Sequence, residues 1–276
     1  MVTVIIPALN EAETIGTVIG LVKRSPLVSD IIVMDDKSHD NTITVAREAG
    51  ATVFTSTSLG KGASMREGIL FAKNEFLLFL DADITTYPEN IVELMTGPLA
   101  DGTADFVKSV FTRQAGRVTE LVAKPLLRLL FPDLARFAQP LSGMVAGKKS
   151  MLQNLELEND YGVDIGMLID MHIMGVRISE VNIGYIENRM QSWEQLSKMS
   201  LEVSRAIIRR GEPLQPKEGE TLKKVNVLRT QMEYGVRENR QGFSRMVIFD
   251  MDNTLLKGSF ITTASRILGF EEELIN

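Results

Sequence analysis

The segment Phe76-Leu77-Leu78-Phe79-Leu80-Asp81-Ala82-Asp83 is the clearest indication of the fold, because five apolar residues lead directly into a pair of acidic residues, Asp81 and Asp83. A short continuous apolar run that ends at polar residues is typical of a strand buried on both faces. A D-x-D pair on the rim of such a strand brings two carboxylates within reach of one hard cation, Mg²⁺ or Mn²⁺. The alternative is a pair of solvated loop acids. The position directly after the strand favours the metal site.

Upstream of this strand, short apolar segments alternate with helical patterns. Asn10 is a candidate N-cap, and Glu13 would complete a capping box. Gly50 occupies the position of a C′ glycine. This alternation predicts an α/β fold with a mostly parallel, Rossmann-like sheet flanked by helices. We expect strands at residues 2–6, 30–34, 51–55 and 76–80 and a helix at 62–73.

Polar clusters follow three of the predicted strands, at residues 7–11, 35–40 and 81–83. Ligands of parallel sheets bind outside the carboxyl ends of the strands, so these clusters predict a binding site. Asp40 or Asn41 also caps the next helix. Gly60-Lys61-Gly62 precedes a helix, where Lys61 can meet a phosphate or a base carbonyl. The other interpretation of these three residues is an ordinary turn, because the remainder of a Walker motif is missing.

The second half of the chain is less regular. We expect strands at residues 104–110 and 176–183 and helices at 117–130, 161–174 and 192–210. The segment 211–243 is charged and polar, and it is predicted to be a linker or an exposed helix. A new strand then opens a second unit. The predicted organisation is a first domain at 1–210, the segment 211–243 as a C-terminal extension, and a separate fragment at 244–276.

Composition narrows the class of protein. The 276 residues carry a formal net charge of −6 and include no cysteine. The chain therefore has no disulfide framework and no thiolate zinc site. An acidic balance argues against a general nucleic-acid binder. The N-terminus lacks the pattern of a signal peptide, and no apolar run reaches the ~20 residues that span a bilayer, so we expect a soluble, cytoplasmic protein.

The motifs above occur in the order typical of the GT-A glycosyltransferases. Four further segments narrow the resemblance to the retaining glucosyl-3-phosphoglycerate synthases and the related mannosyl-3-phosphoglycerate synthases. The resemblance covers roughly residues 1–210. It implies transfer of a hexose, with UDP-glucose as the expected donor, to 3-phosphoglycerate by a homodimer that uses Mg²⁺ or Mn²⁺. The four segments are Lys108-Ser109, 116–121, 139–143 and 161–166.

The resemblance also implies roles for individual residues. Asp83 would ligate the metal with Asp81 beside it, and Asp164, where the family usually has Glu, would lie near the sugar hydroxyls. No carboxylate nucleophile is required, since a diphosphate oxygen can take the acceptor proton. The implied nucleotide-sugar residues are Pro7, Ala8, Leu9, Glu11, Asp36, Lys61, Asp81 and Ala82, and the implied acceptor residues are Gly116, Arg117 and Thr119. The implied catalytic residues are Asp83, Asp164 and Arg117.

Two positions depart from the family. Asn188 aligns with a histidine that usually supplies the third metal ligand, and Met190 replaces an acceptor-site asparagine. An asparagine carbonyl is a weaker ligand for Mn²⁺ than imidazole. Neither His39 nor His172 lies at the ligand position. We therefore expect Asn188 to take the place of the histidine with reduced metal affinity.

The C-terminal fragment contains Asp250-Met251-Asp252-Asn253-Thr254 after an apolar strand. This resembles the first motif of haloacid-dehalogenase-type phosphatases, in which Asp250 would be the nucleophile and Asp252 the general acid and base. Such phosphatases need a following ~150 residues with further catalytic groups, so we expect no phosphatase activity from the sequence as given. The alternative is a strand and helix that dock on the main domain.

Other functions remain open at this point. The donor can be GDP-mannose in place of UDP-glucose. A polyprenyl-phosphate glycosyltransferase shares the N-terminal motifs, and residues 121–137 would then lie on a bilayer surface. A non-catalytic sugar-nucleotide-binding protein would account for the missing histidine.

Overall fold

The computed structural model of the protein describes residues 1–112, 116–187 and 192–211, which belong to one compact unit spanning Met1–Gln215. The predicted metal ligand Asn188 and the predicted phosphatase residues Asp250 and Asp252 lie outside the described residues. The predicted segments 211–243 and 244–276 lie almost entirely outside them as well.

Seven strands of the described region form one sheet in the order β3-β2-β1-β4-β6-β5-β7. Strand β1 pairs in parallel with β2 and β4, β2 with β3, and β5 with β7, which confirms the mostly parallel sheet. Strand β6 lies between β4 and β5 and runs antiparallel to both. The strands are β1 Val2–Ala8, β2 Val28–Asp35, β3 Thr52–Thr55, β4 Phe76–Phe79, β5 Phe106–Thr112, β6 Val145–Lys148 and β7 Ile178–Tyr185.

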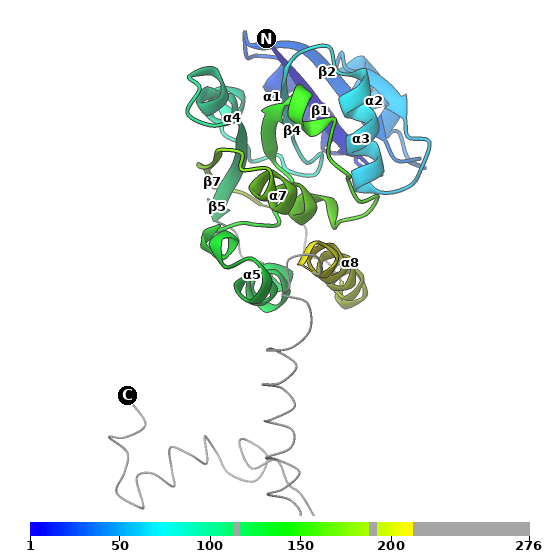
Figure 1. Ribbon diagram of the computed structural model, residues 1–276. Coiled ribbons are helices and arrows are strands. Elements are labelled where there is room, and N and C mark those ends of the chain that lie inside the picture. The colour runs from blue at the N-terminus through cyan, green and yellow to red at the C-terminus, as the bar shows by residue number, and fades with distance from the viewer. Residues whose placement is uncertain (113–115, 188–191, 212–276) are drawn as a thin grey trace, which may run out of the picture. The chain divides into compact units, whose positions relative to one another are not determined.

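Helices cover both faces of this sheet (Figure 1). Residues of one face of the central strands pack with α1 and α4, and residues of the other face pack with α3 and α7. Strand β1 shows the alternation, since Val4 and Ile6 lie in the first cluster and Ile5 lies in the second. The helices are α1 Ile15–Val22, α2 Thr42–Glu48, α3 Lys61–Phe71, α4 Ile91–Ala100, α5 Lys124–Leu130, α6 Lys149–Leu152, α7 Val163–Ile173 and α8 Trp193–Gly211, with a 3₁₀ turn at Pro132–Arg136.

A third apolar cluster joins α5, α7 and α8. Leu127, Phe131 and Phe137 pack there against Ile165 of α7 and Val203 of α8. Several apolar residues of segment 121–137 are therefore buried in this cluster. Leu121 and Leu129 of the same segment are 75% and 78% exposed.

The predicted helix at 117–130 is confirmed, and it contains a π-helical turn at Thr119–Ala123 directly before α5. Pro125 has no N–H to donate to the regular helical ladder, and the π-helical turn lies immediately before it. One local prediction was wrong. Asn10 does not cap α1; it adopts φ 58°, and its Oδ1 accepts a hydrogen bond from His39 N at 2.8 Å. Gly50, with φ 98°, occupies the predicted C′ position after α2.

Candidate functional site

The site lies at the carboxyl edge of the sheet, where the ends of β1, β2 and β4 come together. Ala8 at the end of β1 pairs with Asp35 at the end of β2, and Asp81 follows two residues after β4. Because these strands are parallel, the polar clusters predicted at their ends lie at one edge. Of the predicted nucleotide-sugar residues, Ala8 and Ala82 are buried, Pro7 and Glu11 are partly exposed, and Leu9 is exposed.

The loops after β1 and β2 are bonded directly to each other. Asn10 N donates to Ser38 Oγ at 2.9 Å, Glu11 N to Thr42 Oγ1 at 2.8 Å, and Ala12 N to Asp40 Oδ2 at 3.1 Å. Asp40 Oδ1 also accepts from Thr42 N, the first residue of α2, at 3.0 Å, whereas the N-cap residue is Asn41, whose side chain makes no capping hydrogen bond. These bonds fix the Pro7-to-Glu11 segment beside the second loop.

Asp36 is buried and turns toward the glycine turn before α3. Its two carboxylate oxygens accept hydrogen bonds from Gly60 N at 3.0 and 2.9 Å. Burial raises the pKa of Asp36, and the Gly60 bond acts in the opposite direction. One role of Asp36 is therefore to hold this turn in place.

Both glycines of the turn are required by close packing. A Cβ on Gly60 would lie 2.1 Å from Asn159 O, and one on Gly62 would lie 1.8 Å from Glu158 O. Gly60 also has a φ of 118°, which L side chains rarely adopt. The turn thus packs directly on the loop before α7. Lys61, the residue between the two glycines, therefore lies near the start of α7.

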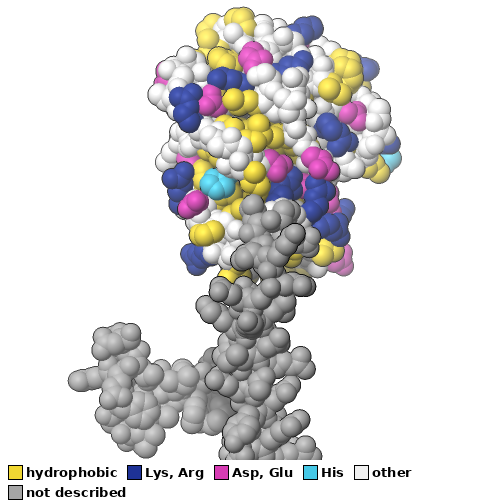
Figure 2. All heavy atoms as spheres, in the orientation of Figure 1, with side chains coloured by type: hydrophobic (Ala, Val, Ile, Leu, Met, Phe, Trp, Pro, Cys, Tyr) yellow, Lys and Arg dark blue, Asp and Glu magenta, His cyan; other side chains and the backbone are white. Residues whose placement is uncertain are grey.

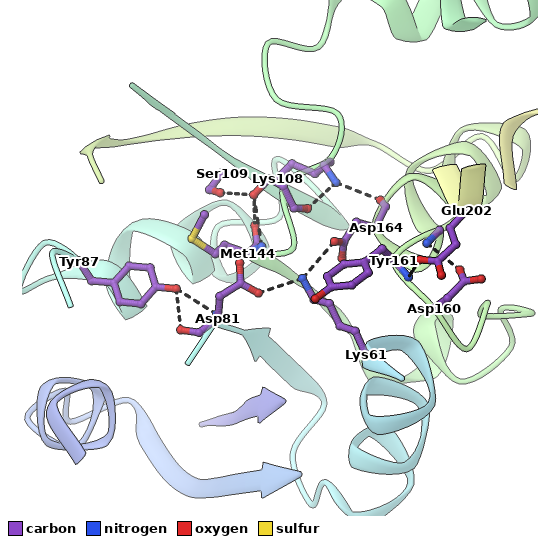
Figure 3. A network of polar contacts seen from close by, with 12 residues as sticks. Lys61, Asp81, Tyr87, Lys108, Ser109, Met144, Asp160, Tyr161, Asp164 and Glu202 are labelled. Atoms are coloured by element: carbon purple, nitrogen blue, oxygen red, sulfur yellow. Dashed lines mark hydrogen bonds and ion pairs between the residues drawn. The ribbon is translucent and has the colours of Figure 1, made fainter. Parts of the chain in front are cut away.

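Lys61 is the centre of the candidate site (Figure 3). Its ammonium lies 2.9 Å from Asp81 Oδ1 and 3.0 Å from Asp164 Oδ2. Burial favours the neutral amine, but the charges of Asp164 and Asp81 outweigh it and raise the pKa of Lys61 above its ordinary value. Lys61 is therefore a permanent cation that joins Asp81 after β4 to Asp164 in the first turn of α7.

Asp164 is buried, and its Oδ1 has no hydrogen-bond partner within the described structure. Burial raises its pKa and Asp81 raises it further, whereas Lys61 and Lys108 lower it. A buried carboxylate oxygen without a partner is costly unless a ligand supplies a donor. Asp164 is therefore prepared to accept a hydrogen bond from a ligand such as a sugar hydroxyl.

Lys108 of β5 fixes the far side of the cluster. Its buried ammonium donates to Ser142 O at 2.9 Å and to Asp164 O at 3.2 Å, and burial lowers its pKa to about 8. Ser109 Oγ and Ser142 Oγ lie 2.6 Å apart. These bonds hold the loop before β6 so closely that a Cβ on Gly143 would lie 2.1 Å from Lys61 Nζ.

The D-x-D pair lies beside a buried tyrosine. Tyr87 Oη accepts from Asp81 N at 3.0 Å and donates to Asp81 O at 3.1 Å. Burial raises the pKa of Tyr87 well above its usual value, and the charges of Asp81 and Asp83 add to this. Asp83 is partly exposed on the same turn.

The predicted acceptor residues lie at the start of the π-helical turn. The guanidinium of Arg117 lies over the exposed ring of Trp193, 4.8 Å from its centroid, as in a cation–π contact. Thr119 is buried, and its Oγ1 has no hydrogen-bond partner within the described residues. Gly116 is partly exposed, and no atom lies within 4 Å of the position of a Cβ there.

The donor set fits a hard divalent cation that is shared with a ligand. Asp81 and Asp83 offer carboxylate oxygens, although Asp81 Oδ1 already contacts Lys61. Across residues 1–112, 116–187 and 192–211 there is no group of three His, Cys, Asp or Glu side chains that could hold a metal alone. Mg²⁺ is commonly held by one or two carboxylates together with substrate phosphates, which this pair satisfies.

Sequence reasoning missed two residues of this site. Tyr87 and Trp193 make the contacts described above, yet neither belongs to a motif. Tyr87 follows Asp81 by six residues in a loop, and no periodicity marks that spacing. Trp193 was recognised only as part of the helix at 192–210.

The face drawn in Figure 2 is not dominated by one sign of charge, because acidic and basic side chains are mixed there with apolar side chains between them. Within the part of the chain that the structure describes, no helix is both long and apolar enough to span a membrane.

The sequence and the fold both match known glycosyltransferases. The profile of the family described as "Glycosyl transferase family 2" matches residues 3–154. Glucosyl-3-phosphoglycerate synthase of Mycolicibacterium smegmatis is 34% identical over 234 residues, which cover 76% of this chain and 77% of that protein. The enzyme of the same name from Petrotoga mobilis is 32% identical and matches over 74% of this chain and 71% of its own length.

Solved structures of glucosyl-3-phosphoglycerate synthase have the same fold as this chain. The crystal structure of glucosyl-3-phosphoglycerate synthase from Mycobacterium tuberculosis with Mn²⁺, UDP-glucose and phosphoglyceric acid has a TM-score of 0.74 at 34% identity. It covers 79% of this chain and 82% of its own. A complex of the same enzyme with Mg²⁺ and UDP has a TM-score of 0.73 at 33% identity. The chain therefore belongs to glycosyl transferase family 2, within the glucosyl-3-phosphoglycerate synthases.

Proposed function

We propose that this enzyme transfers glucose from UDP-glucose to 3-phosphoglycerate with retention of configuration. The observation that carries the proposal is the meeting of Lys61, Asp81 and Asp164 at the carboxyl edge of the sheet. Relatives about one-third identical are named for this activity, and one was solved with UDP-glucose and phosphoglyceric acid bound. The geometry suits chemistry that depends on positioning and charge stabilisation.

The nucleotide would lie along the ends of β1 and β2. The cross-bonded loops present the backbone of Pro7, Ala8 and Leu9 together with Glu11 to a base and ribose. Asp36 orients the Gly60 turn, and Lys61 then meets the diphosphate as a buried cation. The bonds between the two loops support this assignment, because a pre-ordered pocket loses less entropy when it binds.

Asp81 and Asp83 would hold Mg²⁺ or Mn²⁺, with Asn188 as a further candidate ligand. The ion, when bound, neutralises charge on the leaving diphosphate. Lys61 contributes positive charge at the same place and keeps Asp81 oriented. The sugar would lie toward Asp164, whose unpartnered Oδ1 can accept a hydrogen bond from a hydroxyl group.

The acceptor would bind at the start of the π-helical turn. Arg117 presents a guanidinium fork suited to a phosphate or carboxylate. Trp193 lies against that guanidinium, and Thr119 Oγ1, which has no partner among the described residues, offers a further hydrogen bond. The acceptor hydroxyl would lose its proton to a diphosphate oxygen on the same face of the sugar.

The remaining assignments are extensions of this proposal. We infer a homodimer from the resemblance to the glucosyl-3-phosphoglycerate synthases alone. We infer a phosphatase-like C-terminal fragment with Asp250 and Asp252 from the resemblance to the first motif of haloacid-dehalogenase-type phosphatases alone. A polyprenyl-phosphate acceptor is disfavoured, because relatives that match about three-quarters of this chain are named glucosyl-3-phosphoglycerate synthases. GDP-mannose remains the competing donor.

Release of nucleoside diphosphate, measured with UDP-glucose or GDP-mannose and with or without 3-phosphoglycerate, tests the proposal. We expect release that requires both UDP-glucose and 3-phosphoglycerate, and an α-linked product by NMR. Release of nucleoside diphosphate that does not depend on 3-phosphoglycerate would contradict the proposal that 3-phosphoglycerate is the acceptor. Nucleotide binding without any turnover would favour a binding protein.

A further inference from the structure

The backbone of Asp81 lies just beyond the regular pairing of β4. The strand ends at Phe79, and Leu80 N still donates to Ile5 O at 3.2 Å. Past this point the N–H and C=O of Asp81 need other partners, because buried or partly buried backbone groups are rarely left unpaired. Whatever supplies these partners decides where the D-x-D turn lies.

One hydroxyl group supplies both. Tyr87 Oη accepts from Asp81 N at 3.0 Å and donates to Asp81 O at 3.1 Å (Figure 3). A phenolic hydroxyl has one proton to donate and lone pairs to accept, so it can satisfy the two groups together. The hydroxyl of Tyr87 therefore takes the place of the backbone partners that a neighbouring strand would offer to Asp81.

Tyr87 is itself held firmly. It is 6% exposed, and it packs in the apolar cluster that includes Ile84, Ile91 and Leu80. Its position is therefore set by the core of the domain and not by the loop. The hydroxyl transmits that fixed position to the turn that carries Asp81 and Asp83.

We propose that Tyr87 is a positioning residue that orders the Asp81-to-Asp83 turn for the divalent cation and the nucleotide diphosphate. This inference rests on the proposed function. The Asp81 side chain contacts the ammonium of Lys61 at 2.9 Å, so one of its carboxylate oxygens already has a partner. The hydrogen bonds of Tyr87 hold the backbone of the same residue. Without the hydroxyl, binding has to order the turn first, which weakens affinity.

The test is Tyr87→Phe, which keeps the ring in the core and removes only the hydroxyl. Mn²⁺ binding in the presence of UDP, with no acceptor, is measured by electron paramagnetic resonance. We expect affinity for Mn²⁺ to fall by about 10-fold, the size seen when groups that orient metal ligands are removed. The Mn²⁺ concentration for half-maximal transfer should rise in parallel, and the KM for 3-phosphoglycerate should stay within about twofold.

Tyr185→Phe is the matched control, because Tyr185 is 49% exposed on β7 and should leave Mn²⁺ binding unchanged. Recovery of Tyr87→Phe activity at saturating Mn²⁺ separates a displaced turn from misfolding. Equal Mn²⁺ affinity in Tyr87→Phe and the parent enzyme would overturn the inference, as would failure of the parent enzyme to bind Mn²⁺ with UDP. Weaker Mn²⁺ binding in an enzyme that transfers no glucose would support the role of Tyr87 and refute the proposed function.

Discussion

Gly143→Ala should disrupt the candidate site through one added methyl group. The new Cβ would lie 2.1 Å from Lys61 Nζ and 3.1 Å from oxygens of both Asp81 and Asp164. Ordinary contact begins at 3.4 Å, so the ammonium has to move by about 1.3 Å. The backbone of Gly143 has no left-handed φ, so the effect comes from this contact alone.

Because the ammonium is held between two carboxylates, we expect a displacement of this size to cost at least one of the two ion pairs. They measure 2.9 and 3.0 Å, and none of the three side chains is more than 26% exposed. A hydrogen bond between charged groups contributes about 1.5–3 kcal/mol, so we expect roughly 2–4 kcal/mol of lost stability. For a domain of this size that lowers the Tm by roughly 5–15 °C. If the same energy is lost from the transition state, kcat/KM falls by about 30-fold or more.

Thermal unfolding and steady-state release of nucleoside diphosphate measure both effects. The control is Gly97→Ala in α4, where no atom lies within 4 Å of the Cβ position. A glycine-to-alanine change inside a helix stabilises by about 0.5–1 kcal/mol. If Gly143→Ala keeps the parent's Tm and kcat/KM, the close approach of this loop to Lys61 is wrong.

Four further changes test separate parts of the structure. Asp83→Asn should lower transfer by about 100-fold or more with an unchanged circular dichroism spectrum, because a metal ligand is lost; near-normal turnover at high Mg²⁺ would refute that role. Arg117→Ala should raise the KM for 3-phosphoglycerate by about 10-fold or more, the effect of one charged hydrogen bond, while the KM for the donor stays within about twofold. Burial lowers the pKa of Lys108 to about 8 from an ordinary 10.5, so between these pH values the unfolded chain holds a proton that the folded chain has lost. The contribution of Lys108 to the free energy of unfolding therefore rises with pH by about 1.4 kcal/mol per unit, and urea unfolding of Lys108→Met should lack that rise. Arg210, at the end of α8, pairs with the carboxylates of Glu158 and Asp170. Arg210→Met leaves both without that partner and should lower the free energy of unfolding in urea by about 3–5 kcal/mol, with a smaller loss in Arg210→Lys.

The parallel half of the fold could be predicted because its signals are local. The continuous apolar run before Asp81 and the alternation of strand and helix patterns can both be recognised from residues that are close together in the sequence. Strand β6 could not be predicted in this way, since it has only four residues and includes Gly147. Helix α4 was also missed, because Gly97 and Pro98 lie within it and both disfavour a helix.

The sequence named several residues that the structure brings into contact, but it did not predict the contacts themselves. Asp81, Lys61 and Asp164 were each expected, and the structure joins them in one ion cluster. Asp36 was expected at the nucleotide, and the structure adds that its carboxylate accepts hydrogen bonds from Gly60 N. Side-chain partners that are distant in sequence leave no periodic signal. For the same reason nothing in the sequence marked Tyr87, which is hydrogen-bonded to the backbone of Asp81.

The reversed direction of β6 has a consequence for how acceptor preference can diverge. Strands β4 and β5 both end at the site, and β6 begins there, because it runs antiparallel to each. The connection between β5 and β6 therefore leaves and rejoins the sheet at one edge, so it can be exchanged as a single segment. We expect chimeras that swap this connection between family members to trade acceptors while they keep the same donor.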